Sequence, residues 1–164
     1  SYLDVLEALP RVTDSSRTML WSVARAQLEF LDTTMAGRPA QKAVRAAGRK
    51  LLAPVLEQLT WTPAPREDAQ TAELRGTLIA LLAKFDHAPT VAQAVRAFDD
   101  DDAGTRKLPA ALRRPVTLAV GMHADRAHFE RLLARLKAEG DAARVAGGEI
   151  VGMRDQEGER GLGG

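Results

Sequence analysis

Hydrophobic side chains recur every three or four positions through most of the chain, in segments separated by proline, glycine and polar residues. Side chains at that spacing lie on one face of an α-helix, so the pattern indicates helices that bury one side. It predicts main helices at about 15–35, 39–59, 67–85, 89–98, 109–120 and 124–139, after the end of a shorter helix at 2–9. Two of the stripes are Leu20, Val23, Ala24, Leu28 and Leu31 in the first main helix, and Leu74, Leu78, Leu81, Leu82 and Phe85 in the third.

Residues at the segment ends support these boundaries. Thr13, Asp14 and Ser15 offer oxygen atoms that can cap the first main helix, and Gly37 suits its C-terminal turn. Pro39 is a favourable first-turn residue for the next helix. Pro54 lies inside that helix, where it removes one backbone hydrogen bond, so we expect a kink there.

The connections between successive helices are mostly short, which favours antiparallel neighbours. The helices therefore pair as hairpins at a spacing of roughly 40–50 residues, as in HEAT and armadillo arrays. We predict an all-α fold of antiparallel helix hairpins in a HEAT- or armadillo-like α-α superhelix over residues 1–139. No repeated sequence motif accompanies the pairing, so the superhelix rests on the pairing alone. Residues 140–164 hold most of the 13 glycines and no apolar stripe, and we predict a disordered tail.

Composition narrows the classes of partner. The chain has a net charge of +1, without a basic patch that alternates with aromatic residues, so we expect no nucleic-acid partner. No apolar run approaches the roughly 20 residues that span a bilayer, so we expect no membrane partner. Because the chain has no cysteine, disulfides, thiol catalysis and cysteine-type zinc sites are excluded.

The residues that commonly carry chemistry do not form a known motif. A helical zinc site needs two histidines four positions apart, with a glutamate beside the first, whereas His123 and His128 are five apart and Ala124 follows the first. The run 99–104 imitates a calcium loop, but Ala110 occupies the twelfth position, which needs glutamate. A solvated acidic turn is the favoured interpretation of that run. No serine lies in a Gly-x-Ser-x-Gly elbow. We therefore predict no catalytic, cofactor-binding or metal-binding residue in this chain.

Trp21 and Trp61 are the only tryptophans of the chain. They either stack on a ligand or close helix–helix junctions, where one large ring buries much apolar area. The second interpretation is favoured.

Several short motifs occur in a characteristic order, and each alone is weakly specific. These are Leu20 to Leu31 with its tryptophan, Leu56 to Trp61, Leu74 to Leu78, Ala94 to Phe98, Leu108 to Arg113 and Gly121 to His123. Together they resemble the C-terminal helical domain of the aminopeptidase N type of zinc aminopeptidases, a group that includes the endoplasmic-reticulum aminopeptidases. The resemblance covers about residues 2–137.

The resemblance implies an all-α superhelix that packs against a thermolysin-like catalytic domain, covers its active-site cavity and restricts which peptides enter. It implies that the partners are the upstream catalytic domain of the same polypeptide and a peptide substrate, and that zinc is bound by that missing domain. No family catalytic residue maps onto this chain, which begins at Ser1 and is expected to be a fragment. The glycine-rich end departs from the family, where further helices follow.

Arg75 is the candidate for a peptide contact, because a helical wall that admits peptides would meet their carboxylates. A hydrogen bond on the helix surface or between helices is its favoured alternative role. Two other functions stay open: a stand-alone helical-repeat scaffold that binds another protein, and an independent enzyme, which no group of residues supports. The compartment, cytoplasmic or periplasmic, stays open, and the Ala- and Arg-rich usage is compatible with a GC-rich bacterial genome.

Overall fold

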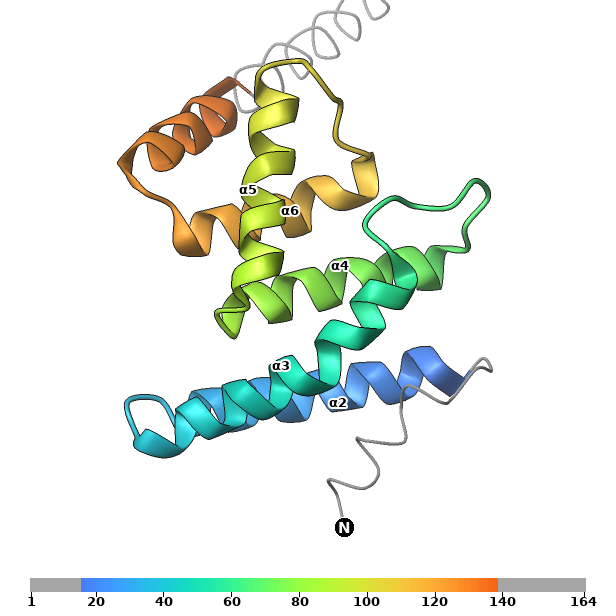
Figure 1. Ribbon diagram of the computed structural model, residues 1–164, viewed down its shortest axis with the longest axis vertical. Coiled ribbons are helices and arrows are strands. Elements are labelled where there is room, and N and C mark those ends of the chain that lie inside the picture. Colours follow the sequence, from blue (N-terminus) through green and yellow to red (C-terminus); the bar gives the residue numbers. More distant parts are fainter. Residues whose placement is uncertain (1–15, 139–164) are drawn as a thin grey trace, which may run out of the picture. The chain divides into compact units, whose positions relative to one another are not determined.

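The computed structural model describes residues 16–138, and every regular element within that range is an α-helix (Figure 1). The labelled helices are α2 (Ser16–Thr34), α3 (Pro39–Leu59), α4 (Ala69–Lys84), α5 (Ala88–Asp102) and α6 (Ala110–His123), and a further helix occupies 126–138. The all-α prediction is confirmed. The short helix at 2–9 and the tail at 140–164 lie outside the described residues. The chain divides after His123 into two compact units, and the helix 126–138 belongs to the second.

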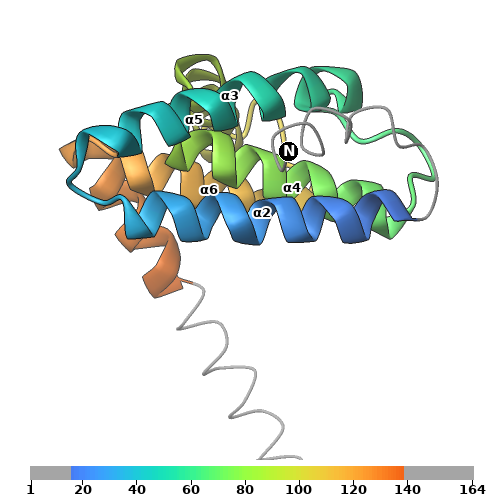
Figure 2. The same ribbon diagram turned by 90° about the horizontal axis from the view of Figure 1, so that it is seen from below.

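Helix α4 is the centre of the first unit and contacts α2, α3, α5 and α6. Figure 1 shows α2 and α3 as an antiparallel hairpin on one side of α4, with α5 crossing α4 and α6 on the other. Figure 2 shows α2 and α3 in front of α4, which contacts both. Because neighbours surround it, α4 buries more than one stripe, and its core includes Leu74, Leu78, Ile79 and Leu82.

Helix α3 has the predicted bounds, begins with Pro39 and carries Pro54 in its interior. Helix α4 begins two residues later than predicted. The Asp68 side chain caps it by accepting hydrogen bonds from the Thr71 backbone N–H (2.8 Å) and hydroxyl (2.7 Å). Glu67 is therefore outside the helix, where its side chain can turn toward α4.

Helix α5 is longer than predicted, so the acidic run Asp99–Asp102 is helical and the prediction of an acidic turn is wrong. The following segment bonds back onto this helix end. The Thr105 N–H donates to the Asp100 carbonyl (2.9 Å), and the Leu108 N–H donates to Asp101 Oδ1 (2.9 Å). The first bond satisfies a carbonyl of the last helical turn, which the helix itself leaves unpaired, and the second holds the following loop to an acidic side chain of that turn.

A polar network joins the α2–α3 hairpin to the corner after α4. Asp32 of α2 is 3% exposed and accepts a hydrogen bond from Arg45 Nε (2.7 Å). Arg45 Nη1 also donates to Asp86 Oδ2 (2.6 Å). Burial raises the pKa of Asp32, but hydrogen bonds from Arg45 and Gln41 and the charge of Arg45 outweigh it and lower this pKa.

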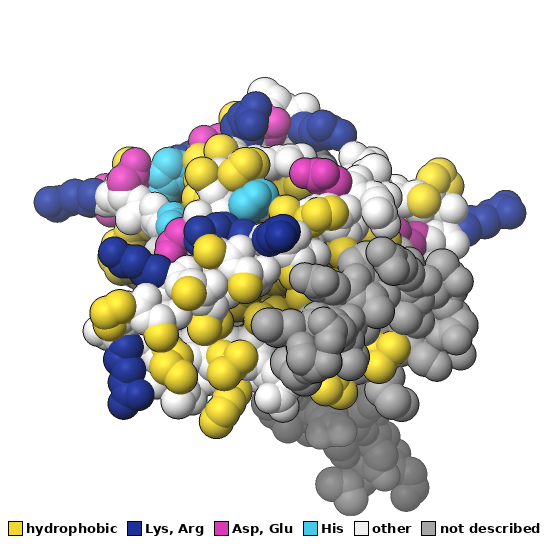
Figure 3. All heavy atoms as spheres, turned by 60° about the horizontal axis from the view of Figure 1, so that its bottom comes forward, with side chains coloured by type: hydrophobic (Ala, Val, Ile, Leu, Met, Phe, Trp, Pro, Cys, Tyr) yellow, Lys and Arg dark blue, Asp and Glu magenta, His cyan; other side chains and the backbone are white. Residues whose placement is uncertain are grey.

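The outer surface of the hairpin side carries both apolar and basic groups. Figure 3 shows hydrophobic side chains there in several separate patches, with Lys and Arg side chains between and around them. Val23 and Phe30 of α2 are 51% and 63% exposed.

None of the helices within 16–138 has the length and hydropathy needed to cross a membrane.

Candidate functional site

The Arg75 side chain is 1% exposed and lies between the end of α3 and the start of α4. Its guanidinium forms a bidentate ion pair with the Glu67 carboxylate. Nε also donates to the Thr60 carbonyl (2.7 Å), and Nη2 donates to the Leu59 carbonyl (3.1 Å). These two carbonyls belong to the C-terminal end of α3, where no intrahelical donor is available. Arg75 therefore makes the inter-helix hydrogen bonds that were its alternative predicted role.

The Arg75 contacts fix the loop between α3 and α4. This loop has a positive φ at two non-glycine residues, Thr60 (φ 58°) and Arg66 (φ 64°). Few residues other than glycine adopt this backbone conformation readily. Arg75 holds it at Thr60 and at Glu67, on both sides of Trp61. Direct contact between Arg75 and a peptide stays a prediction.

Acid should weaken this anchor. The hydrogen bond from Arg75 lowers the pKa of Glu67, against the opposing effect of burial. A carboxylate whose pKa is lower in the folded than in the unfolded state stabilises the fold above its ordinary pKa, and that contribution is lost as the pH falls through the folded value. We expect the free energy of unfolding to fall between about pH 5 and pH 3, and Glu67→Gln to make that fall shallower. Urea unfolding across this range measures both curves, and parallel curves would contradict the assignment.

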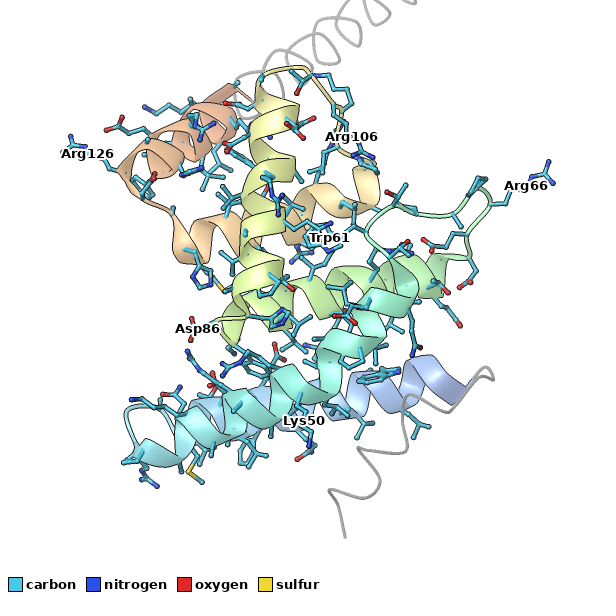
Figure 4. All side chains as sticks on the ribbon, in the orientation of Figure 1. Lys50, Trp61, Arg66, Asp86, Arg106 and Arg126 are labelled. Carbon is cyan, nitrogen blue, oxygen red and sulfur yellow. The ribbon has the colours of Figure 1, made fainter. Side chains whose placement is uncertain are left out.

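A second feature of the first unit is a pocket of about 630 Å³, here called the Trp61 groove. Three segments line it: the α3–α4 loop, one side of α5, and the α5–α6 loop with the start of α6. Its lining includes Trp61, Arg96, Asp100, Arg106, Lys107 and Leu112. Figure 4 shows Trp61 projecting from the α3–α4 loop toward α5, with Arg106 on the α5–α6 loop.

Backbone bonds hold the α5–α6 loop beside the groove. The chain turns at Gly104, whose φ of 71° favours glycine. The Arg106 N–H then donates to the Asp100 carbonyl (3.1 Å), which fixes the segment that carries the Arg106 and Lys107 side chains. Leu108, only 7% exposed, ties the end of the loop to the core.

The Trp61 groove carries an excess of positive charge. Three cationic side chains, Arg96, Arg106 and Lys107, line it with one acid, Asp100. None of the three forms an ion pair with another residue in the part of the chain that the structure describes. The Arg96 side chain makes a long hydrogen bond within its own helix, from Nε to the Ala92 carbonyl (3.4 Å). The three positive charges are therefore available to an anionic ligand.

The histidines have local partners. His87 Nδ1 lies 2.8 Å from Thr90 Oγ1, and burial with the charge of Arg49 lowers the pKa of His87. His123 Nε2 lies 2.8 Å from the Ala83 carbonyl oxygen, and His128 Nδ1 lies 2.8 Å from Asp125 Oδ1. Within 16–138, no three His, Cys, Asp or Glu side chains are grouped so that they could hold a metal ion.

The two tryptophans have different environments. Trp21 of α2 is 3% exposed, which agrees with the junction interpretation. Trp61 is half-buried and lines the groove, so part of its ring is accessible to a ligand. The helical pattern of the sequence does not predict the groove. A weak signal was the basic pair Arg106-Lys107, set between a glycine turn and Pro109.

Comparison with known proteins identifies the family. Residues 1–147 match the model of the ERAP1-like C-terminal domain, and the chain belongs to this family. Part of it is 38% identical over 81 residues to Aminopeptidase M1 of Arabidopsis thaliana, covering 46% of this chain and 9% of that protein. The match thus spans less than a tenth of the length of that relative. The predicted resemblance to the C-terminal domain of this aminopeptidase family is confirmed.

Proposed function

We propose that this chain is the non-catalytic C-terminal domain of a zinc aminopeptidase, which packs on an upstream catalytic domain of the same polypeptide and restricts the access of peptides to it. The observation that carries the proposal is the family match over residues 1–147. The parent enzyme would bind zinc in its catalytic domain and remove N-terminal residues from peptides. This chain would contribute a surface that limits access to the active site, and it would contribute no catalytic residue.

The packing of the first unit supports such a role. Its central helix α4 contacts four neighbouring helices. The buried Arg75 bonds to the end of α3, and the half-buried Arg45 bonds to the buried Asp32 of α2, so both arginines tie neighbouring helices together. A wall that excludes substrates by shape must resist deformation, and close packing with satisfied buried polar groups provides that resistance. Stacked helix hairpins of a HEAT-like array would add a concave face suited to extended ligands.

The identity of the parent can be tested in the coding DNA. The frame upstream of Ser1 is expected to continue and to encode His-Glu-x-x-His, followed downstream by a glutamate ligand, because these residues hold the zinc ion of such enzymes. A stop codon followed by a start codon just before Ser1 would contradict the proposal. It would support the stand-alone scaffold instead.

Restriction of access can be tested in the parent enzyme. A specific protease site placed just before Ser1 lets the domain be cut away after folding, so that the catalytic domain does not have to fold without it. We expect the cut enzyme to keep its activity on a single-residue amide substrate. Its activity on a ten-residue peptide, relative to that amide, should change severalfold. The same enzyme without the added site, exposed to the same protease, is the control. An unchanged ratio after the released domain has been removed would contradict access restriction.

A further inference from the structure

We infer that the Trp61 groove binds an acidic segment of a peptide chain. In this arrangement, Asp or Glu side chains of the ligand meet Arg96, Arg106 and Lys107, and a neighbouring apolar side chain packs on Trp61 and Leu112. The inference concerns this chain alone and does not depend on a catalytic domain.

Charge gives the first argument. Three cations and a single acid line one pocket, and none of the three cations forms an ion pair with another described residue. An arginine guanidinium presents a planar fork of N–H donors that matches a carboxylate, and such charge-assisted bonds are stronger than neutral ones. Two arginines on different elements, Arg96 on α5 and Arg106 on the following loop, can therefore hold two carboxylates at separate points.

Shape gives the second argument. The groove volume of about 630 Å³ falls within the range of ligand pockets, roughly 300–1,000 Å³, and holds a few side chains rather than one ion. Leu108 and Leu112 are 7% and 4% exposed and belong to the core below the groove. The half-buried indole of Trp61 adds a large rigid apolar surface. Tryptophan is a residue type that is common where peptides bind. A free inorganic anion would use none of this apolar surface.

The groove is also preorganised. Backbone hydrogen bonds to the Asp100 carbonyl hold the α5–α6 loop on one side. Arg75 holds Thr60, the neighbour of Trp61, on the other side. Because both loops are ordered before binding, little conformational entropy is lost when a ligand enters.

The charge distribution favours a peptide over a nucleic acid. Nucleic-acid sites follow the phosphate backbone with an extended basic stripe. Here the net charge of the chain is +1, and Asp100 lies inside the groove, where it would repel a continuous row of phosphates. Two or three carboxylates spaced along a short peptide suit the three cations better.

Fluorescence anisotropy with the 164-residue chain tests the inference. The probe is a labelled hexapeptide, acetylated at its N-terminus and amidated at its C-terminus, with two glutamates flanking a leucine. The matched peptide carries glutamines in their place. We expect saturable binding of the glutamate peptide, at least tenfold weaker binding of the glutamine peptide, and weakening by salt.

Variants locate the site. Arg96→Gln and Arg106→Gln should each raise the Kd about threefold, and together about tenfold, because each removes one exposed charge pair. Asp100→Asn should lower the Kd about twofold to threefold, because it removes an exposed negative charge that repels the ligand carboxylates. The matched control is Lys42→Gln with Lys50→Gln, which removes two exposed charges from α3, outside the groove lining. It should leave the Kd unchanged. Circular dichroism melting checks that every variant is folded.

Four outcomes would overturn the inference. The first is equal binding of the glutamate and glutamine peptides, and the second is a control with Lys42→Gln and Lys50→Gln that weakens binding as much as the groove variants do. The third is a single-stranded oligonucleotide that binds more tightly than the peptide and displaces it. The fourth is a peptide whose only carboxylate is its C-terminus and that binds as tightly as the glutamate peptide. The last outcome would assign the groove to chain ends instead of acidic side chains. Because no catalytic domain takes part in this binding experiment, a negative result would not bear on the test of access restriction.

Discussion

Replacing Arg75 with alanine should lower the free energy of unfolding by about 3–5 kcal/mol, as expected when one partner of a buried ion pair is removed. The Arg75 side chain is 1% exposed and that of its partner Glu67 is 9% exposed. The substitution leaves the carboxylate without its counter-charge and the Leu59 and Thr60 carbonyls without their donors. Each buried acceptor that loses its partner adds a desolvation cost. Urea unfolding followed by circular dichroism measures the loss.

Two variants separate the parts of this effect. Arg75→Lys keeps the charge but lacks the planar fork, so it should retain only part of the stability. Arg75→Met with Glu67→Leu removes both charges and should cost less than Arg75→Ala, because no unpaired carboxylate remains. A loss below about 1 kcal/mol for Arg75→Ala would place the arginine among surface ion pairs and contradict its structural role.

The same variants address the predicted peptide contact of Arg75. If Arg75 acts only through the loop that it anchors, a change in peptide-length preference of the parent enzyme should follow the loss of stability across Arg75→Lys and Arg75→Ala. Direct contact predicts a different result: Arg75→Lys, which keeps a cation at this position, would preserve the preference even though it destabilises the fold. Comparing unfolding curves with cleavage of short and long peptides distinguishes the two.

The sequence predicts the helices well where apolar spacing and end signals agree, as in α3. It fails at the end of α5, because four consecutive aspartates disfavour a helix C-terminus, both by propensity and by charge against the helix dipole. Tertiary bonds override these local preferences: the N–H of Leu108 reaches Asp101 from the next loop. A bond between residues seven positions apart has no signature in helical periodicity.

The stripe of the first main helix was partly misplaced. Leu28 is buried as predicted, but Val23 is 51% exposed. The buried face of α2 also includes Trp21 and Asp32, and Val23 lies two positions, roughly 200° around the helix, from Trp21. Asp32 could not be recognised as buried, because its burial depends on Arg45, thirteen residues away on the next helix.

The Trp61 groove was missed for a related reason. Its lining comes from three segments, around Trp61, around Arg96 and around Arg106, and no helical period links them. Scattered arginines on amphipathic helices usually indicate solvated faces, so their convergence on one tryptophan becomes visible only when the crossing of α4 and α5 and the two loop conformations are known. The role of Arg75 in holding one of those loops was likewise only one of two sequence-based alternatives.

Replacing Phe85 with alanine should cost about 3–5 kcal/mol, the range for removing a buried aromatic side chain and leaving a cavity. Phe85 is the C-cap residue of α4 and is 0% exposed, and its ring lies against Gly48 of α3. A Cβ atom built at Gly48 would lie 2.5 Å from the ring, so glycine is what allows the two helices to approach this closely. Thermal unfolding by calorimetry or circular dichroism measures the loss.

Gly48→Ala tests whether the ring is held in place. Glycine to alanine inside a helix normally stabilises by about 1 kcal/mol, whereas the added methyl group here should meet the Phe85 ring and cost about 1–3 kcal/mol. We therefore expect a net loss or no gain in stability. Combining Gly48→Ala with Phe85→Leu should cost less than the sum of the single changes, because the smaller side chain leaves room for the methyl group. A clear gain in stability from Gly48→Ala alone would show that the ring moves freely. It would contradict the close contact between Gly48 of α3 and the Phe85 ring.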